Sequence, residues 1–309
     1  MLKEFELLKK ISTSSSCPHA FLFVGPTDVG KFETAINFAK FLNCENREVE
    51  NWRKIGLEKC DCEQCIAIDK GIHPDFYIIE KQEDKKEIVD SQIINKDKKE
   101  GIIYKINNNP IFGKYNIVII KNAELMNKTV SNTILKNLEE PKNNTIFILT
   151  TTNKKNILET IVSRCMIVEF SLLNKKEAYE LIENKNNKEL ILDLSSLKYK
   201  KIKELNNIDV FNKYVVDIKD FSKILKAKDF EKIAYINRIL ENKENLNYFI
   251  YIWELFFDFY LLKKNIDLIG DVKLLNIGEN MKKLYNIKNA VMGNYILKLG
   301  LINFLLEMN

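Results

Sequence analysis

A phosphate-loop pattern near the N-terminus constrains the fold of this chain more than any other feature. Gly25, Gly30 and Lys31 stand at the fixed positions of the pattern G-x-x-x-x-G-K. The apolar run 20–24 before the loop predicts a buried strand, and the apolar spacing over 31–43 after it predicts a helix. In this context the two glycines let backbone N–H groups surround a phosphate, and the lysine reaches its outer oxygens. The pattern predicts a P-loop fold.

The rest of the first 170 residues alternates between short apolar runs and helical patterns. Residues Met126–Glu140 carry apolar side chains at helical spacing, and Pro141 ends the predicted helix. Lys81–Glu100 is rich in charge, and we expect it to be a solvated loop. Further strands are predicted at Asp75–Ile79, Tyr115–Ile120, Thr145–Thr150 and Met166–Phe170. This alternation predicts an α/β unit with a mostly parallel sheet flanked by helices on both faces.

Strand signals largely disappear after Ser171. The residues Lys175–Lys185 predict a helix, and a short polar segment is expected from there to about Leu205. Apolar residues at helical spacing then predict helices at Lys213–Lys226, Phe230–Glu241, Asn245–Lys264, Val272–Leu284 and Val291–Met308. At roughly 150 residues per domain, a chain of 309 residues suggests two or three domains. The pattern divides it into 1–170, a small helical part 171–205 and a helical part 206–309.

The sequence predicts no membrane-spanning segment, and we expect the chain to be cytoplasmic. The most apolar stretch, Phe249–Leu262, is short and contains Glu254 and Asp258, whereas a membrane helix needs about 18 apolar residues. We expect this helix to be buried in its own bundle or at a subunit interface. The N-terminus has no secretory signal. A net charge of +5 is too small to indicate a dedicated nucleic-acid-binding protein.

The residues that complete a nucleotide-hydrolysing site are replaced in this sequence. Phe32 follows the loop lysine, where a Ser or Thr hydroxyl binds Mg²⁺. Lys121 stands at the end of a later apolar strand, where an Asp holds the metal, and Asn122 stands where a Glu polarises water. Three losses at one site predict a loop that no longer hydrolyses nucleotide. The favoured interpretation is a loop kept for folding, with at most an anion bound.

Four of the six cysteines form a pattern of metal ligands. The pattern is Cys44-x₁₅-Cys60-x-Cys62-x₂-Cys65, which supplies enough thiolates for a tetrahedral zinc site. Four sulfur ligands leave no open position, so the predicted Zn²⁺ is structural. A decayed site and free thiols are the alternatives, while a disulfide is disfavoured in the cytosol. His73 lies nearby and is expected to be a turn residue before Pro74.

Several segments together resemble one family, the AAA+ subunits of the bacterial DNA polymerase III clamp loader. The resemblance covers about residues 15–170, and the C-terminal half is similar only in size and helical character. The segments that carry it are Ile117–Asn127, Ser131–Pro141 (SNTILKNLEEP), Thr145–Asn153, Thr160–Cys165 (TIVSRC) and His73-Pro74-Asp75 after the cysteines. The resemblance implies an AAA+ base with a zinc-module insertion at about 44–66, a small helical lid and an all-α collar for oligomerisation. The family spaces its last three cysteines C-x₂-C-x₂-C, and this chain is one residue shorter.

The resemblance also implies roles for the Ser-Arg-Cys triplet. In this family Arg164 reaches the nucleotide site of a neighbouring subunit as an arginine finger, with Ser163 and Cys165 as positioning residues. Its planar guanidinium would stabilise charge on a γ-phosphate. The alternative for an arginine before a strand is a non-catalytic role, as a surface residue or an ion-pair partner.

The substitutions in the phosphate-loop site make the chain similar to the non-hydrolysing delta prime subunit. Such a subunit supports ATP-dependent loading of the sliding clamp onto primed DNA, with motor (gamma/tau) and delta subunits as partners, in a complex with ATPase and DNA polymerase activity. One alternative is an active AAA+ ATPase like the motor subunit. The other is a zinc-containing DNA-binding module, which the few basic and aromatic residues beside the cysteines disfavour.

Overall fold

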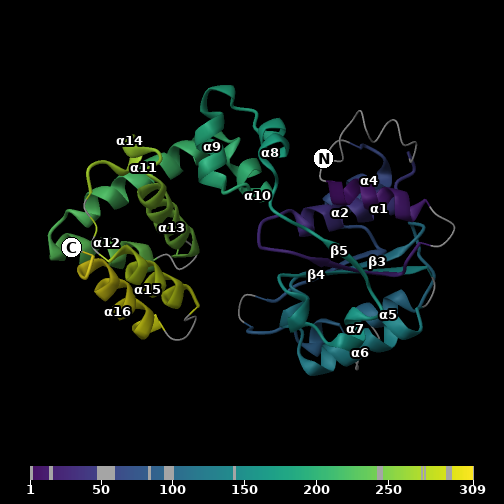
Figure 1. The fold of residues 1–309 in the computed structure, drawn as a ribbon. Helices are drawn as coiled ribbons and strands as arrows, with labels where there is room; N and C mark the ends of the chain where they lie inside the picture. The colour runs from purple at the N-terminus through teal and green to yellow at the C-terminus, as the bar shows by residue number, and fades with distance from the viewer. Residues whose placement is uncertain are drawn as a thin grey trace. The chain divides into compact units, whose positions relative to one another are not determined.

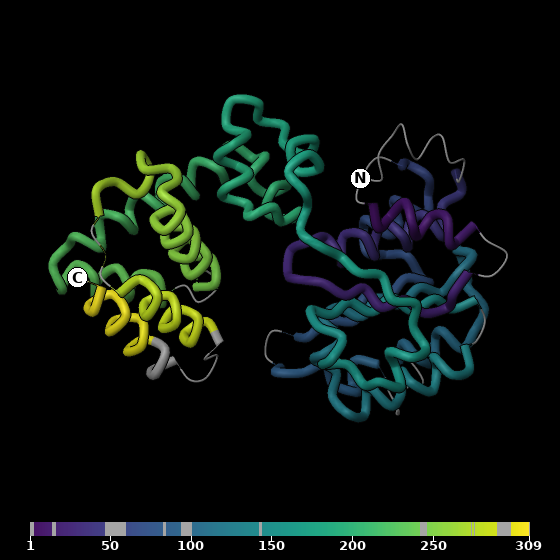
Figure 2. The backbone as a smooth tube through the Cα atoms, in the orientation of Figure 1, coloured from purple at the N-terminus to yellow at the C-terminus, as the bar shows by residue number. Residues whose placement is uncertain are grey.

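The chain forms two compact units in the computed structural model (Figure 1). The first comprises Met1–Leu173 with Lys198–Lys200, and the second comprises Asn174–Leu197 with Lys201–Asn309. In Figure 2 the trace runs from purple to teal through the first unit, and the helices from residue 208 onward are green to yellow. The described residues are 3–13, 17–46, 60–82, 85–93, 101–141, 144–241, 246–272, 274, 276–289 and 294–308.

A five-stranded sheet forms the centre of the first unit, in the order β2-β3-β4-β1-β5. All neighbouring strands pair in parallel, which confirms the predicted sheet. Every residue of the inner strands β3 and β4 is buried, because helices cover both faces. The strands are β1 Ala20–Val24, β2 Phe76–Ile79, β3 Asn116–Ile120, β4 Thr145–Thr151 and β5 Met166–Glu169.

Two apolar cores lie on the two faces of this sheet. One core joins strand residues such as Phe21 to α1 (Lys3–Ser12), α2 (Lys31–Asn43) and α4 (Glu63–Asp69). The other joins residues such as Leu22 to α5 (Ile102–Ile106), α6 (Lys128–Glu139) and α7 (Glu159–Val162). Successive residues of a strand point to opposite faces, so Phe21 and Leu22 enter different cores. Figure 1 shows these helix groups on opposite sides of the sheet.

Short 3₁₀ turns and loops connect these elements. The turns are η1 Asp90–Gln92, η2 Ala123–Leu125 and η3 Lys154–Asn156. The charge-rich segment predicted as a loop contains η1, and Ile88 and Ile93 are buried within its described part. Ile88 also bridges to Met126, so this loop is packed against the unit.

The second unit is helical, as predicted. The expectation of a short polar segment before Leu205 was wrong, because α9 and α10 occupy it. These helices have only seven or eight residues, too short for a clear period, and they bury Ile191, Leu194 and Ile202. The helices are α8 Lys175–Leu181, α9 Lys188–Ser195, α10 Tyr199–Leu205, α11 Ile208–Leu225, α12 Asp229–Glu241, α13 Leu246–Leu262, α14 Ile266–Ile269, α15 Ile277–Asn289 and α16 Asn294–Leu306, with a 3₁₀ turn η4 at Lys185–Asn187. The predicted division into a lid and a collar near residue 205 stays a prediction.

Helix α13 is the centre of the helical unit. Its Trp253 ring stacks on Phe221 of α11 at 5.1 Å and on Phe304 of α16 at 5.7 Å between ring centroids. Such aromatic contacts add to the free energy of burying large apolar surfaces. The apolar run predicted to be buried is therefore packed inside its own bundle. Among the described residues, none of the helices has the length and apolar character that crossing a bilayer requires.

Candidate functional site

The phosphate loop joins β1 to α2, and the geometry of the loop requires its two glycines. Gly30 has φ +92°, in the left-handed region that favours glycine. A Cβ on Gly25 would lie 2.3 Å from the carbonyl oxygen of Phe170, which is a backbone atom that cannot easily move. The amide of Phe170 in turn donates to the carbonyl of Val24. The loop is therefore packed closely against the end of β5.

The loop lysine points back onto the loop itself. The Lys31 ammonium donates to the carbonyl oxygens of Gly25, at 2.6 Å, and Pro26. Burial lowers the pKa of Lys31, and the negative charges of Glu124 and Asp28 oppose that shift. In this arrangement the ammonium neutralises carbonyl dipoles of the loop, in the place where it would otherwise meet a phosphate.

The residues predicted to replace metal-binding groups contact each other. The Lys121 ammonium lies 4.9 Å from the centroid of the Phe32 ring, within the range of a cation–π interaction. It also forms an ion pair with Glu80, at 2.7 Å. Asn122 takes a left-handed conformation with φ +54°, and its amide donates to the hydroxyl of Thr150. The structure thus brings Phe32 and Lys121 together and gives Asn122 a turn-forming role.

Glu124 is a carboxylate near the loop that the sequence patterns did not indicate. Its Oε1 accepts hydrogen bonds from the amide and hydroxyl of Thr152, at 3.1 and 2.9 Å. Its Oε2 is buried without a hydrogen-bond partner in the described part of the chain. Its negative charge is also the strongest that acts on Lys31. The nearby sequence signal was its place just beyond a buried strand, two residues after Asn122.

The four predicted metal ligands converge in the first unit. The sulfur atoms of Cys44, Cys60, Cys62 and Cys65 all lie within 4.8 Å of one another. The Cys44 sulfur is 3.6 Å from that of Cys60 and 3.8 Å from that of Cys62. A tetrahedral ion with Zn–S bonds of about 2.3 Å places its sulfurs about 3.8 Å apart. The donor set and its spacing therefore fit such an ion, despite the shortened C-x-C segment.

Local structure explains why these thiols gather. Cys44 ends α2, Cys62 precedes α4 as its N-cap, and Cys65 lies in the first turn of α4. Burial raises the pKa of Cys44 to about 12 and raises that of Cys65. Burial also acts on Cys62, but backbone N–H groups of Cys65 and Glu45 outweigh it and lower its pKa. A bound cation would stabilise all of these thiolates.

The Ser-Arg-Cys triplet lies between α7 and β5. The Arg164 guanidinium pairs with Glu139 at 2.9 Å and donates to the carbonyl of Thr160 at 2.9 Å. The Ser163 hydroxyl donates to the same carbonyl and accepts from Arg164 at 3.4 Å. Cys165 packs against the core, and burial raises its pKa to about 12. The Arg164 side chain is 37% exposed, so a second molecule can reach it.

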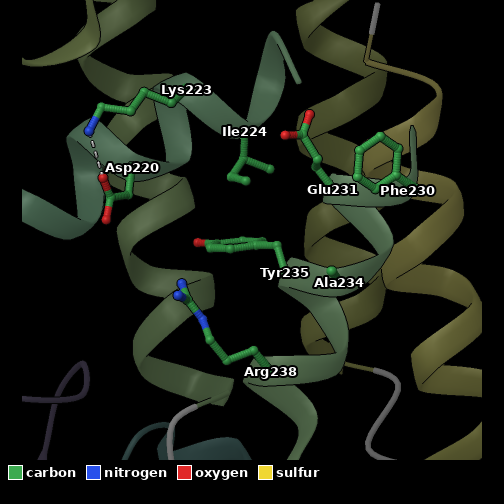
Figure 3. Close-up of a pocket in the computed structure, with 8 residues that line it drawn as sticks. All are labelled: Asp220, Lys223, Ile224, Phe230, Glu231, Ala234, Tyr235 and Arg238. Carbon is green, nitrogen blue, oxygen red and sulfur yellow. Dashed lines mark hydrogen bonds and ion pairs between the residues drawn. The ribbon is translucent and has the colours of Figure 1, made fainter. Parts of the chain in front are cut away.

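A pocket of about 380 Å³ lies between α11 and α12 in the second unit (Figure 3). Its apolar wall includes Phe230 and Tyr235, and Arg238 lies 5.4 Å from the Tyr235 ring centroid. Asp220 and Lys223 at its rim form an ion pair of 2.9 Å. Asp220, Lys223 and Arg238 thus interact with neighbours on their own helices.

Comparison with known proteins decides the family. Residues 2–174 match the family model described as DNA polymerase III, delta subunit. The chain belongs to this clamp-loader AAA+ family. It is 32% identical over 181 residues to the DNA polymerase III subunit gamma of Buchnera aphidicola subsp. Baizongia pistaciae, which covers 56% of this chain and 43% of the relative.

The curated relatives of this chain include both gamma and delta' subunits of DNA polymerase III. The chain is 30% identical to the DNA polymerase III subunit delta' of Pseudomonas aeruginosa, over 48% of this chain and 42% of the relative. The delta' subunit of Bacillus subtilis is 31% identical, over 51% of this chain and 44% of the relative. The chain thus matches less than half the length of these curated relatives.

A solved structure shares the fold over nearly the whole chain. The crystal structure of a gamma subunit-related protein of DNA polymerase III from Thermotoga maritima has a TM-score of 0.55 and 15% identity. The match covers 98% of each chain, so the similarity extends into the helical second unit. It supports the P-loop AAA+ architecture with a helical C-terminal part.

Proposed function

We propose that this chain is a non-hydrolysing, delta prime-like subunit that supports ATP-dependent loading of the sliding clamp onto primed DNA in the cytoplasm. The contact between Lys121 and Phe32 carries this proposal. A cation on an aromatic ring occupies the positions where a carboxylate and a hydroxyl would hold Mg²⁺. Family membership supports the place of the chain in a DNA polymerase III complex.

The phosphate loop supports the same conclusion. Lys31 already uses its ammonium on carbonyl oxygens of the loop, so binding a phosphate would require breaking those hydrogen bonds. The neighbouring positive charge of Lys121 is neutralised by Glu80. The loop then serves mainly as a packed connection between β1 and α2.

The contribution of this chain to hydrolysis would come from Arg164. Its pairing with Glu139 holds the guanidinium at an exposed position, from which it can pass to a phosphate of a neighbouring motor subunit. Ser163 fixes the same turn through the carbonyl of Thr160, and Cys165 anchors it to the core. In this arrangement Arg164 acts in trans, with Ser163 and Cys165 as positioning residues.

Structural Zn²⁺ in the four-cysteine cluster and oligomerisation through residues 206–309 complete the proposal. The cluster lies at the ends of α2 and α4 and would fix their contact, since its four sulfurs leave no open position for catalysis. The partners would be motor (gamma/tau) and delta subunits, with the clamp and primer–template DNA bound by the assembled complex.

Reconstitution of the complex tests the role of Arg164. The full chain, with Arg164→Ala or Arg164→Lys, is assembled with the other subunits, and ATP hydrolysis and clamp loading are measured. Such fingers are worth about 10³–10⁵ in rate in GTPases, so a loss of at least about tenfold is expected. The matched control is Lys155→Ala, an exposed cation in η3. Unchanged hydrolysis with Arg164→Ala would refute the finger.

Glu124 favours a second candidate, an active ATPase of the motor type. Its Oε2 is buried and has no hydrogen-bond partner among the residues that the structure describes, and its charge acts on the loop lysine. Carboxylates are the ligands that Mg²⁺ prefers. Hydrolysis by the purified chain distinguishes the candidates. Mg²⁺-dependent turnover that disappears in both Lys31→Ala and Glu124→Gln would support this second candidate and contradict the first.

A further inference from the structure

Hydrogen bonds hold the surface segment 111–115, between α5 and β3, more than apolar packing does. The side chains of Ile111 and Phe112 are 82% and 40% exposed, so their burial contributes little to the order of the segment. The backbone of the segment is bound instead by three buried side chains, those of Asn43, Gln64 and Asp75. The order of residues 111–115 therefore depends on what fixes these three side chains.

Asp75 anchors the first part of the segment to the sheet. Its carboxylate accepts hydrogen bonds from the amides of residues 111, 112 and 113, at 2.8, 2.7 and 2.7 Å. Hydrogen bonds to a carboxylate are about twice as strong as those between neutral groups. The carbonyl of Asp75 in turn accepts from the amide of Ile117 in β3, at 2.8 Å. Residues 111–113 are thus attached to the edge of the sheet.

Asn43 holds the second part of the segment, and it directly precedes Cys44. Its side-chain oxygen accepts from the amides of Lys114 at 3.1 Å and Tyr115 at 2.9 Å, and its side-chain nitrogen donates to the carbonyl of Tyr115 at 3.0 Å. A Cβ on Gly113 would lie 2.5 Å from that nitrogen, so the backbone passes close to the Asn43 side chain. Asn43 is the last residue of α2, and Cys44 caps this helix.

Gln64 binds the segment from α4, and it directly precedes Cys65. Its side-chain nitrogen donates to the carbonyl of Phe112 at 2.8 Å, and its side-chain oxygen lies 2.7 Å from Nε2 of His73. Helices α2 and α4 cover the same face of the sheet (Figure 1). Two of the three side chains that hold the segment are therefore sequence neighbours of predicted metal ligands.

A metal ion in the four-cysteine cluster would fix the helix ends that carry these two side chains. Cys44 lies at the end of α2, whereas Cys62 and Cys65 lie at the start of α4, and the four sulfurs are within 4.8 Å of one another. An ion bonded to all of them would crosslink the two helix ends. Helix α4 has seven residues, and a helix of this length is marginal without such support. Loss of the ion therefore makes these ends open more often.

We infer that metal occupancy of the four-cysteine cluster controls the order of the surface segment 111–115, an inference that rests on the Zn²⁺ of the proposed function. The metal acts through Asn43 and Gln64, whose hydrogen bonds to the segment are made only while the ends of α2 and α4 are closed. Asp75 keeps residues 111–113 attached to the sheet in either state. The response to metal loss is therefore graded, large at residues 114 and 115 and smaller at residues 111–113.

Amide hydrogen exchange of the full chain, resolved by residue, tests the inference. Protein with Zn²⁺ bound is compared with the same protein after chelation by EDTA under reducing conditions. Exchange at residues 114 and 115 should accelerate at least about fivefold, because the net contribution of one hydrogen bond corresponds to about that factor. Exchange at residues 111–113 should accelerate less, and exchange in β4 should stay within about twofold. Addition of Zn²⁺ should restore the original rates.

The Asn43→Ala variant tests the path from the metal to the segment. With Zn²⁺ bound, its exchange at residues 114 and 115 should match that of the chelated wild type, and chelation should then add less than about twofold. Asn127→Ala is the matched control, because Asn127 also binds a backbone amide, that of Val130 at the start of α6, but on the other face of the sheet. It should leave exchange at residues 114 and 115 within about twofold and keep the response to chelation.

Elemental analysis of the same samples distinguishes failure of metal binding from failure of the coupling. An unmodified chain without zinc contradicts both the Zn²⁺ of the proposed function and this inference. A zinc-containing chain whose exchange at residues 114 and 115 is unchanged by chelation contradicts only the inference. Equal acceleration in β4, or a full response to chelation in Asn43→Ala, also overturns it. The chelation comparison uses the unmodified chain, so it decides the matter even if Asn43→Ala does not fold.

Discussion

The ammonium of Lys121 lies over the ring of Phe32, with 4.9 Å between the nitrogen and the ring centroid. The two residues are 89 positions apart in the chain and belong to the phosphate-loop helix and the end of β3. Each stands at a position where the phosphate-loop pattern predicts a ligand of Mg²⁺. Their contact indicates that the two residues form one interaction, which under the proposed function takes the place of a metal site.

A double-mutant cycle on Phe32→Ala and Lys121→Ala should reveal that interaction. We expect a coupling of about 0.5–1 kcal/mol in the free energy of unfolding, as for partly exposed cation–π pairs. Urea unfolding of the four proteins measures it. The Glu80→Gln variant serves as a control, because it removes only the ion-pair partner of Lys121. Strictly additive effects of Phe32→Ala and Lys121→Ala would show that the ring and the ammonium do not interact.

Release of Arg164 from its ion pair with Glu139 should leave ATP hydrolysis by the reconstituted complex nearly unchanged. The Glu139→Gln variant removes the partner but leaves the guanidinium available. Because partly exposed ion pairs contribute about 0–1 kcal/mol, the unfolding free energy should change little. In the reconstituted complex, ATP hydrolysis should stay within about threefold of wild type. If Glu139→Gln lowers hydrolysis as much as Arg164→Ala does, the ion pair itself is required. The hypothesis that Arg164 leaves Glu139 to contact a neighbouring subunit is then wrong.

Metal removal should destabilise the first unit. We expect one zinc ion per chain by elemental analysis of protein purified without chelators, bound by the four-cysteine cluster. Chelation should lower the melting temperature, since structural zinc contributes directly to folding free energy. Cys62→Ser should lower both zinc content and melting temperature. Cys17→Ser, outside the cluster, is the control. Equal zinc content in both variants would contradict the assignment of the ligands.

Stability should fall as the pH drops through the range in which histidine titrates. Burial lowers the pKa of His73, so the folded chain resists protonation while the unfolded chain binds a proton near pH 6.5. The stabilising contribution is therefore present above pH 6.5 and is lost as the pH falls towards the lowered value. Urea unfolding measures the free energy of unfolding at pH 7.5 and 5.5. Its decrease between the two pH values should be smaller in His73→Gln than in wild type. An identical pH dependence would remove His73 as the cause.

Loss of the Asp75 carboxylate should be among the most damaging single changes. Asp75→Ala leaves the amides of residues 111–113 without their acceptor, at a cost of about 1–3 kcal/mol per unsatisfied buried group. These amides are part-buried, so we expect a total loss of about 2–4 kcal/mol. Hydrogen exchange should accelerate at residues 111–113 more than in β4. Unchanged exchange there would show that the carboxylate does not hold residues 111–113.

Much of the fold followed from local patterns. The predicted strand Ala20–Val24 and helix Lys31–Asn43 have those bounds in the structure. Long amphipathic helices such as α11 were found, although the predicted start was five residues late. The helices α1, α9 and α10 were not predicted, because a short helix shows few turns of its period. Their stability comes from tertiary packing, for example of Phe5 and Leu8 in the first core.

The sequence by itself determined the chemistry of individual positions. A phenyl ring at residue 32 and an ammonium at residue 121 cannot bind Mg²⁺, and four close cysteines can bind zinc, whatever the fold. Only the tertiary structure decided which distant residues meet: Lys121 with Phe32 and Glu80, Arg164 with Glu139, and Asp75 with the amides of residues 111–113. These contacts depend on strand order and on the packing of helices over the sheet, which bring together groups that no local spacing connects.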